Sequence, residues 1–249
     1  MIHSVSPGPE LDVEALAAAY AYPDDTPRGR WVRANMVGTA DGAAMGGSGV
    51  TRAISNDSDR ALFALLRALS DVILVGPRTV RLENYGPAKI RPEHAEIRGD
   101  RPPPAIAVMT STLDLDFESR LFTESVVPTI VFTAASAPDD VMAVASKVAE
   151  VVVVGEEHVD LTKVVESLAA RGQTRMLCEG GPGILASVAA EGLLDELCLA
   201  LSPVLSGGRA GRIMRGADLP GGLPLRLAST VTDEDGFLFL RYLVQNSVG

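Results

Sequence analysis

The sequence is poor in the residues on which several classes of protein depend. It holds 2 cysteines, 3 histidines and 1 tryptophan among 249 residues. Two cysteines cannot form a disulfide scaffold, and neither has the spacing of a metal site, so no bound metal is expected. The histidines are too scattered to indicate a histidine-based triad. Cys178 and Cys198 lie in apolar runs, where we expect buried and unreactive thiols.

Long apolar runs are absent as well. No segment reaches the roughly 20 apolar residues that span a bilayer, and the N-terminal segment lacks the basic and then apolar pattern of a signal peptide. We therefore expect a cytoplasmic protein without membrane contact. Acidic residues outnumber basic ones by 32 to 22, which gives a net charge of −10. Such a chain is repelled by a phosphate backbone, so nucleic acid is not an expected partner.

Apolar runs and helical patterns alternate along most of the chain. Short apolar runs predict strands at residues 31–38, 71–76, 105–109, 129–133, 151–154, 175–179 and 196–205. Helical spacing predicts helices at residues 12–20, 61–69, 138–149, 161–170 and 182–191, with a short one opening at Pro77. Two last apolar runs, at 223–231 and 237–244, flank turn residues and are typical of an antiparallel hairpin. This order predicts an α/β fold with three αβα layers, a mostly parallel sheet and an antiparallel C-terminal hairpin.

We expect one domain over residues 31–249, preceded by an N-terminal extension of residues 1–30. The extension ends in a link rich in proline, aspartate and glycine. A polar, proline-rich stretch at residues 83–104 predicts a long loop, and loops of that length in compact domains are usually functional.

The strongest local pattern is RMLCEGGPGIL at residues 175–185. A buried strand ends at Glu179, two glycines turn the chain, and Pro182 suits the first turn of a helix. This geometry directs unpaired backbone N–H groups and the positive end of a helix toward open space, as in pyrophosphate sites. A tight turn without a ligand explains the residues equally well, and the spacing differs from a Rossmann fingerprint.

A second turn of the same kind follows the run at residues 72–75. The strand ends in Gly76, Thr79 offers a hydroxyl in the first turn of a short helix, and Glu83 follows where that helix ends. Open α/β sheets bind ligands at the carboxyl ends of their strands. Helix capping by Thr79 and a solvated helix end at Glu83 are the structural alternatives.

Asp41 follows the first predicted strand, between Ala40 and Gly42. A carboxylate at a strand end can serve as acid, base or ligand anchor. An Asp–Gly turn whose side chain bonds to the backbone is the alternative, and that turn is favoured. Because acid–base groups are scarce and no Walker loop occurs, we expect a bound cofactor to carry the chemistry.

Together these patterns resemble the C-terminal reductase domain of bacterial riboflavin biosynthesis proteins, which has a dihydrofolate-reductase-like fold. The segments that carry the resemblance are TADG at 39–42, AISN at 53–56, LLR at 65–67, DVILVGPRTVRLEN at 71–84 and CEGG at 178–181. They occur in the family's order, and the resemblance covers residues 31–244. It implies NADPH as hydride donor, a homodimer, and reduction of 5-amino-6-(5-phosphoribosylamino)uracil to its ribitylamino product.

The resemblance also implies roles for residues at matching positions. The implied cofactor-binding residues are Val37, Gly76, Thr79, Glu83, Ser111, Gly180, Gly181, Pro182, Gly183 and Ile184, with Ser111 near the adenosine 2′-phosphate. The implied substrate-binding residues are Thr51, Arg67, Pro87, Lys89 and Glu179, with Lys89 or Arg91 near the phosphate. Glu83 and Asp41 are the candidate catalytic residues, because a carboxylate stabilises positive charge on the imine of the opened ribosylamine or moves a proton.

The chain departs from the family pattern around the expected substrate pocket. Ala53 replaces a tryptophan, Glu83 an aspartate, Tyr85 a proline and Asn35 a lysine. Two alternatives therefore stay open: a dihydropterin reductase of the same fold, and a non-catalytic NADPH-binding regulatory protein. The H-x-E and P-C-x-x-C elements of the zinc deaminase found in fused relatives do not occur, so we expect the reductase step alone.

Overall fold

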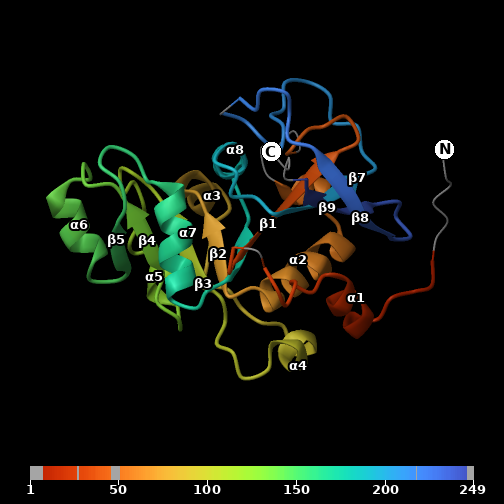
Figure 1. The fold of residues 1–249 in the computed structure, drawn as a ribbon, viewed down its shortest axis with the longest axis horizontal. Coiled ribbons are helices and arrows are strands. Elements are labelled where there is room, and N and C mark those ends of the chain that lie inside the picture. Colours follow the sequence, from red (N-terminus) through yellow and green to blue (C-terminus); the bar gives the residue numbers. More distant parts are fainter. Residues whose placement is uncertain (1–7, 27, 46–50, 217, 246–249) are drawn as a thin grey trace.

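The chain forms one mixed β-sheet with helices on both faces (Figure 1). The computed structural model describes residues 8–26, 28–45, 51–216 and 218–245. Within these residues, nine strands lie in the order β5-β4-β3-β2-β6-β1-β7-β9-β8. The strands are β1 (Trp31–Thr39), β2 (Val72–Val75), β3 (Ala105–Met109), β4 (Ile130–Thr133), β5 (Glu150–Val153), β6 (Arg175–Cys178), β7 (Glu196–Ser202), β8 (Leu225–Thr232) and β9 (Leu238–Val244). Neighbours from β5 to β7 are parallel, whereas β9 pairs antiparallel with β7 and β8, so the predicted sheet is confirmed.

Helices cover the two faces of the sheet and complete the three predicted layers. One face carries α7 (Leu161–Ala170) and α8 (Pro182–Ala190). The other carries α1 (Val13–Ala19), α2 (Asp57–Leu69), α3 (Pro77–Leu82), α5 (Arg120–Thr123) and α6 (Asp139–Ala145). Along β2, Ile73 packs toward α2, while Val72 and Leu74 pack toward α7 and α8, as the alternation of a strand requires. No described helix is long and apolar enough to cross a membrane.

Several predicted segments differ from the structure, and the strand predicted at 196–205 ends at Ser202. The helix predicted at 138–149 ends at Ala145, where the Ser146 hydroxyl donates to the Met142 carbonyl at 2.8 Å. Such a local bond competes with continuation of the helix. The loop predicted at 83–104 contains the 3₁₀ turn η2 (Pro92–His94) and the short helix α4 (Ala95–Arg98).

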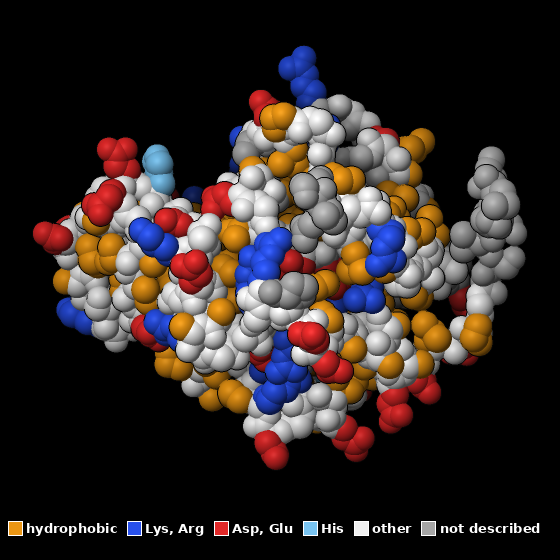
Figure 2. Space-filling model, viewed as in Figure 1, with side chains coloured by type: hydrophobic (Ala, Val, Ile, Leu, Met, Phe, Trp, Pro, Cys, Tyr) orange, Lys and Arg blue, Asp and Glu red, His pale blue; other side chains and the backbone are white. Residues whose placement is uncertain are grey.

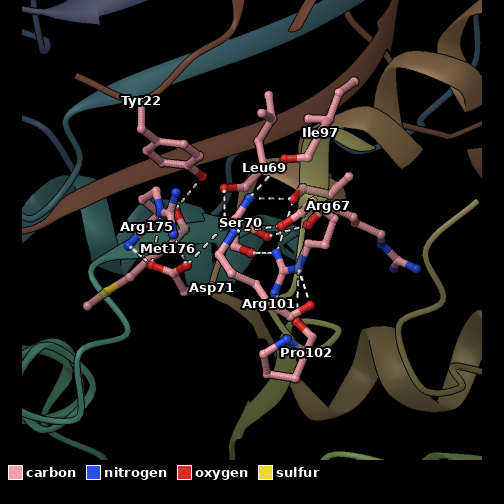
Figure 3. A network of polar contacts seen from close by, with 12 residues as sticks. Tyr22, Arg67, Leu69, Ser70, Asp71, Ile97, Arg101, Pro102, Arg175 and Met176 are labelled. Atoms are coloured by element: carbon pink, nitrogen blue, oxygen red, sulfur yellow. Dashed lines mark hydrogen bonds and ion pairs between the residues drawn. The ribbon is translucent and has the colours of Figure 1, made fainter. Parts of the chain in front are cut away.

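Two arginines, Arg98 and the partly exposed Arg101, hold the end of that segment against α2 and the residue before β2. Arg98 donates to the Ala68 carbonyl at 3.0 Å, and Arg101 forms an ion pair with Asp71 at 3.4 Å. The Arg175 guanidinium also donates to the Asp71 carboxylate, at 2.6 and 3.1 Å (Figure 3). Arg98 and Arg101 donate to carbonyl groups at the end of α2, where helical carbonyls lack partners within the helix. The second half of the long segment is therefore fixed to the core.

The described part of the N-terminal extension also packs against the core. Tyr22 is buried, and its ring lies 4.0 Å from the Arg33 guanidinium carbon. Arg33 and Glu196, both fully buried, form an ion pair of 2.9 Å, and Arg241 contacts the same carboxylate at 2.7 Å. Burial by itself raises the pKa of Glu196, but Arg33 and Arg241 outweigh it and lower the pKa overall. One carboxylate thus ties β1, β7 and β9 together.

Both cysteines are buried and free, as predicted. Burial raises the pKa of Cys178 to about 12 and raises the pKa of Cys198 as well. The two thiols therefore stay protonated at neutral pH, which makes them poor nucleophiles.

Removing the charge of Glu196 would leave two guanidinium groups without their counter-charge. We expect Glu196→Gln to lower the free energy of unfolding by about 3–5 kcal/mol, measured by urea denaturation at pH 7. Because the folded-state pKa of Glu196 is lowered, its contribution is complete above the ordinary value of 4.5 and is lost as the pH falls through the folded value.

Glu150→Gln is the matched control, because it removes a carboxylate from a partly exposed pair with Arg171. We expect it to change the free energy of unfolding by less than about 1 kcal/mol. Equal losses in the two variants would contradict the role assigned to Glu196.

Candidate functional site

The two predicted glycine turns meet at the carboxyl edge of the sheet. β2 and β6 are parallel neighbours, so the turns that follow them start side by side. The Gly76 N–H donates to the Gly180 carbonyl at 2.9 Å, and the Glu179 N–H donates to the Leu74 carbonyl at 3.0 Å. After these turns, α3 and α8 each begin with a proline. Two segments far apart in the sequence thus form one surface.

Close packing at this contact leaves little room for side chains. A Cβ atom on Gly76 would lie 3.0 Å from Ile184 Cγ1, and one on Gly181 would lie 3.0 Å from Thr79 Oγ1. Gly180 has a φ of +86°, which L-residues rarely adopt, and the Gly180–Gly181 peptide bond is cis. The tight packing at Gly76 and Gly181 and the positive φ of Gly180 therefore favour glycine whether or not a ligand is bound.

The start of α8 is the part of this surface suited to a ligand. Its N-cap is Gly181, and no side chain of the described residues caps the helix. The first-turn residues Gly183 and Ile184 lie at the positive end of the helix dipole, where backbone N–H groups lack helical partners. The Pro182 carbonyl accepts the Arg215 N–H at 3.1 Å, so the segment around Arg215 borders the same helix end. Such an end favours a phosphate group.

A closed set of hydrogen bonds lies directly before the glycine turn at residues 180–181 and joins Arg67, Tyr85 and Glu179. Arg67 Nε and Nη2 donate to the two carboxylate oxygens of Glu179 at 2.7 and 2.6 Å. The Tyr85 hydroxyl donates to the same carboxylate and accepts from Arg67 Nη2 at 2.7 Å. Burial would lower the pKa of Arg67, but the Glu179 carboxylate outweighs it and the pKa is raised overall. Two residues expected to bind substrate, Arg67 and Glu179, are thus brought together.

Glu83 and Thr51 meet at the end of α3. The Thr51 hydroxyl, in the 3₁₀ turn η1 (Thr51–Ile54), donates to Glu83 Oε1 at 3.3 Å. Glu83 is exposed, and its N–H donates to the Thr79 carbonyl at 3.0 Å. Val37 lies on β1, is partly buried and packs against the core on the α2 face of the sheet, and it is not part of the Thr51–Glu83 contact. The structure therefore joins two predicted residues, Thr51 and Glu83, by a direct contact at an open helix end.

The Asp41 carboxylate is occupied by protein groups. It accepts the Thr39 hydroxyl and the N–H groups of Ser206 and Gly207, the latter two at 3.1 and 2.7 Å. The Thr39 hydrogen bond, assisted by the two N–H groups, lowers the pKa of Asp41 to about 2. The side chain thus stays ionised at neutral pH and anchors the segment after β7. This arrangement matches the backbone-bonded alternative and does not favour proton transfer by Asp41.

Three other predicted residues lie apart from these contacts. The Ser111 hydroxyl oxygen accepts the Val159 N–H at 3.2 Å, which joins the segments that follow β3 and β5. Pro87 and Lys89 line a small cavity of about 60 Å³ together with Glu124. Lys89 therefore borders Glu124 instead of joining the Arg67–Glu179 pair.

Phe63 is a contact of the site that the sequence patterns did not identify, and Tyr85 was noted only as a departure from the family pattern near the expected pocket, without its partners. The Phe63 ring lies 4.3 Å from the guanidinium carbon of Arg67. The sequence does contain a signal for Phe63: it lies four residues before Arg67, and residues four apart on a helix share one face. The partner of Tyr85, Glu179, is 94 residues away, so no local pattern shows that contact.

Charge is unevenly distributed over the surface. In Figure 2, Lys and Arg side chains gather near the centre of the face, while Asp and Glu side chains are frequent along its left and lower margins. The net charge of −10 is therefore compatible with a locally basic surface. Local cationic groups can attract a small anionic ligand although the whole chain is acidic.

Comparison with known sequences finds relatives of one kind, pyrimidinone phosphate reductases and the RibD C-terminal domain. Residues 30–239 match the model of the RibD C-terminal domain. A 2,5-diamino-6-ribosylamino-4(3H)-pyrimidinone 5′-phosphate reductase from Archaeoglobus fulgidus is 31% identical over 185 residues, which cover 72% of this chain and 83% of that protein. The reductase of the same name from Methanothermobacter thermautotrophicus is 32% identical over 184 residues, with 74% and 82% covered.

Solved structures agree with the sequence relatives. A pyrimidine reductase-like protein from Corynebacterium diphtheriae superposes with a TM-score of 0.80 at 25% identity, over 93% of this chain and 99% of that one. RibD from Acinetobacter baumannii shares the fold, with a TM-score of 0.67 at 19% identity, over 88% of this chain and 59% of that one. The fold is thus that of the riboflavin biosynthesis reductases. The chain belongs to the RibD C-terminal domain family, which confirms the expected family and its class of activity, a reductase.

Proposed function

We propose that this protein reduces a ribosylaminopyrimidine 5′-phosphate to its ribitylamino product with NADPH as hydride donor. The observation that carries the proposal is the contact of the two glycine turns, which places the start of α8 next to the Arg67–Glu179 ion pair. A dinucleotide phosphate and a polar substrate would then occupy neighbouring positions on one sheet edge. The relatives from A. fulgidus and M. thermautotrophicus carry the name of such a reductase.

The residues of the two turns fit a nicotinamide dinucleotide. The N–H groups at the start of α8 suit a pyrophosphate, and the Thr79 hydroxyl borders Gly181 on the same surface. Ser111 accepts the Val159 N–H, which leaves its own O–H to donate to a 2′-phosphate. When bound, the cofactor supplies a hydride from its reduced nicotinamide ring.

Arg67 and Glu83 have different tasks in this proposal. Opening of the ribosylamine gives an imine, and positive charge on its nitrogen makes C1′ a better hydride acceptor. The Glu83 carboxylate, held by the Thr51 hydroxyl, stabilises that charge. Arg67, paired with Glu179, binds oxygen acceptors of the substrate. Asp41 acts in this proposal as the anchor of the segment after β7.

The pyrimidine ring distinguishes two substrates of this reaction. The relatives are named for the 2,5-diamino pyrimidinone, whereas the sequence resemblance implies the aminouracil. The two compounds carry the same ribosylamino phosphate and differ in one ring substituent, an amino or an oxo group. The part that reacts is common to both, so an assay must offer both.

Consumption of NADPH by the purified protein tests the function. The diamino pyrimidinone phosphate, the aminouracil phosphate and dihydrofolate are each offered with NADPH and with NADH. Turnover of either ribosylamino compound with NADPH supports the proposal. Turnover of dihydrofolate alone would assign a dihydropterin reductase, and NADPH binding without any turnover would assign a non-catalytic protein.

In the same assay, Glu83→Gln should lower kcat by about tenfold to a hundredfold, because the amide keeps the size of the side chain and removes its charge. Glu118→Gln removes an exposed carboxylate elsewhere and should leave kcat unchanged. Full turnover by Glu83→Gln would remove Glu83 from the mechanism.

Gly76→Ala tests the cofactor surface without a reaction. Its Cβ atom would lie 3.0 Å from Ile184 Cγ1 in the first turn of α8, so this side chain or the helix start that carries it must give by a few tenths of an ångström. We expect the Kd of NADPH, measured by fluorescence titration, to rise about three- to tenfold. Gly211→Ala is the control, because nothing lies within 4 Å of the Cβ it would add. Equal Kd values for the two variants would place the cofactor elsewhere.

We further propose that the protein forms a homodimer through its C-terminal hairpin. Among the described residues, β8 is the last strand of the sheet, and its outer backbone edge pairs with no other strand. The hairpin also exposes large apolar side chains, Leu225 at 37%, Leu227 at 49% and Leu238 at 36%. An apolar strand edge that is open to water is expected to pair with another chain.

Light scattering after size exclusion tests the dimer. We expect the wild type to elute as a dimer and Leu227→Lys to elute as a monomer, because the charge would be buried at the interface. Val126→Lys, at a side chain 87% exposed on another part of the surface, should remain dimeric. A monomeric wild type, or a dimeric Leu227→Lys, would exclude this interface.

A further inference from the structure

Tyr85 contributes a hydroxyl to the Arg67–Glu179 ion pair from a third part of the chain. Arg67 lies on α2, Glu179 follows β6 and Tyr85 follows α3. The Tyr85 N–H donates to the Val80 carbonyl at 3.1 Å, which holds its backbone against α3. The hydroxyl is thus delivered to the pair by the turn of chain that also carries Glu83.

The Tyr85 hydroxyl forms hydrogen bonds with both members of the Arg67–Glu179 pair. One oxygen of Glu179, Oε2, accepts from both Arg67 Nη2, at 2.6 Å, and the Tyr85 hydroxyl. Arg67 Nη2 in turn donates to the Tyr85 oxygen at 2.7 Å. Without the hydroxyl, the carboxylate would lose a donor and the guanidinium would lose an acceptor. An ion pair out of water is favourable only where such extra bonds are made.

The pair and its hydrogen bonds lie largely out of water, so a missing bond there would not be replaced by a bond to solvent. The Glu179 side chain is 3% exposed and the Arg67 side chain 17%. Burial raises the pKa of Tyr85 well above its ordinary value, so the phenol keeps its proton and stays a donor to Glu179. The Phe63 ring lies against the guanidinium, at 4.3 Å from its central carbon. The guanidinium is therefore held both by its ring contacts and by its hydrogen bonds.

One nitrogen of Arg67 is left for a ligand. Nε and Nη2 are engaged by Glu179 and Tyr85, whereas Nη1 forms no hydrogen bond with any described residue. The planar guanidinium fixes the direction of its nitrogens relative to one another. The orientation of Nη1 is consequently set by the bonds made at Nε and Nη2.

We propose that Tyr85 is a positioning residue for substrate binding: its hydroxyl and the Glu179 carboxylate hold the Arg67 guanidinium so that Nη1 points at an oxygen acceptor of the substrate. The inference rests on the proposed function, which places substrate beside Arg67. Tyr85 acts through the ion pair and not on the reacting atoms. If the hydroxyl is lost, substrate binding must restrict a freer arginine side chain, and this weakens binding.

Tyr85→Phe removes the hydroxyl and keeps the ring. We expect the KM of the ribosylamino substrate to rise about five- to tenfold, with kcat within about twofold, because the lost interaction serves ground state and transition state alike. The Kd of NADPH should not change. Tyr242→Phe is the matched control, because Tyr242 lies on β9, on the opposite side of the sheet from α2.

A double-mutant cycle tests whether Tyr85 acts through the pair. In a Glu179→Gln background, Tyr85→Phe should change KM by less than about twofold, because the pair that it orients is already broken. Independent, multiplying effects of the two substitutions would overturn the inference.

An NMR measurement separates this inference from the proposed function. The Arg67 Nε–H resonance should shift or broaden in Tyr85→Phe and not in Tyr242→Phe, whether or not the protein turns over a substrate. Normal wild-type turnover with an unchanged KM and resonance in Tyr85→Phe overturns the inference and leaves the function standing. If the wild type reduces neither ribosylamino compound, the function fails and the substrate-positioning role of Tyr85 falls with it; a resonance shift then shows only that the hydroxyl holds the Arg67 guanidinium.

Discussion

The parallel pairing of β2 with β6 is the contact on which the candidate site depends. β6 enters the sheet between β2 and β1 after the chain has crossed from the far edge at β5. Its register pairs Leu74 with Cys178, so the next residues carry Gly76 and Gly180 into a hydrogen bond. Leu177 packs on the α2 face, and alternation turns Glu179 to that same face, where Arg67 meets it. A slip of one residue would send Glu179 to the other face of the sheet.

Two buried ion-pair clusters on that face serve different purposes. Glu196 is fully buried and shared by Arg33 and Arg241, and the arginines also contact the N-terminal extension through carbonyl groups of residues 19 and 21. In that cluster the Glu196 carboxylate is buried and bound by both arginines, so it holds β1, β7 and β9 together. The pair of Arg67 and Glu179 is partly exposed at Arg67 and lies at the sheet edge beside the glycine turns. A cluster of the second kind can stabilise the fold and still offer a charged donor to a small molecule.

Sequence patterns identified the elements better than the contacts among them. The two glycine turns were predicted from strand ends, and the structure shows that mutual packing favours glycine there. The Asp–Gly turn at Asp41 is formed, but the N–H groups it binds come from residues 206 and 207, far along the chain. Lys89 matched a basic position by its place in the sequence, yet in the folded chain it borders Glu124. The second half of the predicted loop is held by arginines whose partners lie elsewhere in the chain, such as Asp71, which directly precedes β2.

The sequence by itself determined the alternation of strands and helices, the closing hairpin and the family, because each of these is written in local periodicity, turn residues and short motifs. Only the tertiary structure decided which side chains act together. Sheet order brings β6 beside β2, and the folding of α2 and the segment after α3 over one face then joins Arg67, Tyr85 and Glu179. The physical reason is that hydrogen bonds and ion pairs act over a few ångströms in space, whereas sequence spacing reports neighbours along the chain alone.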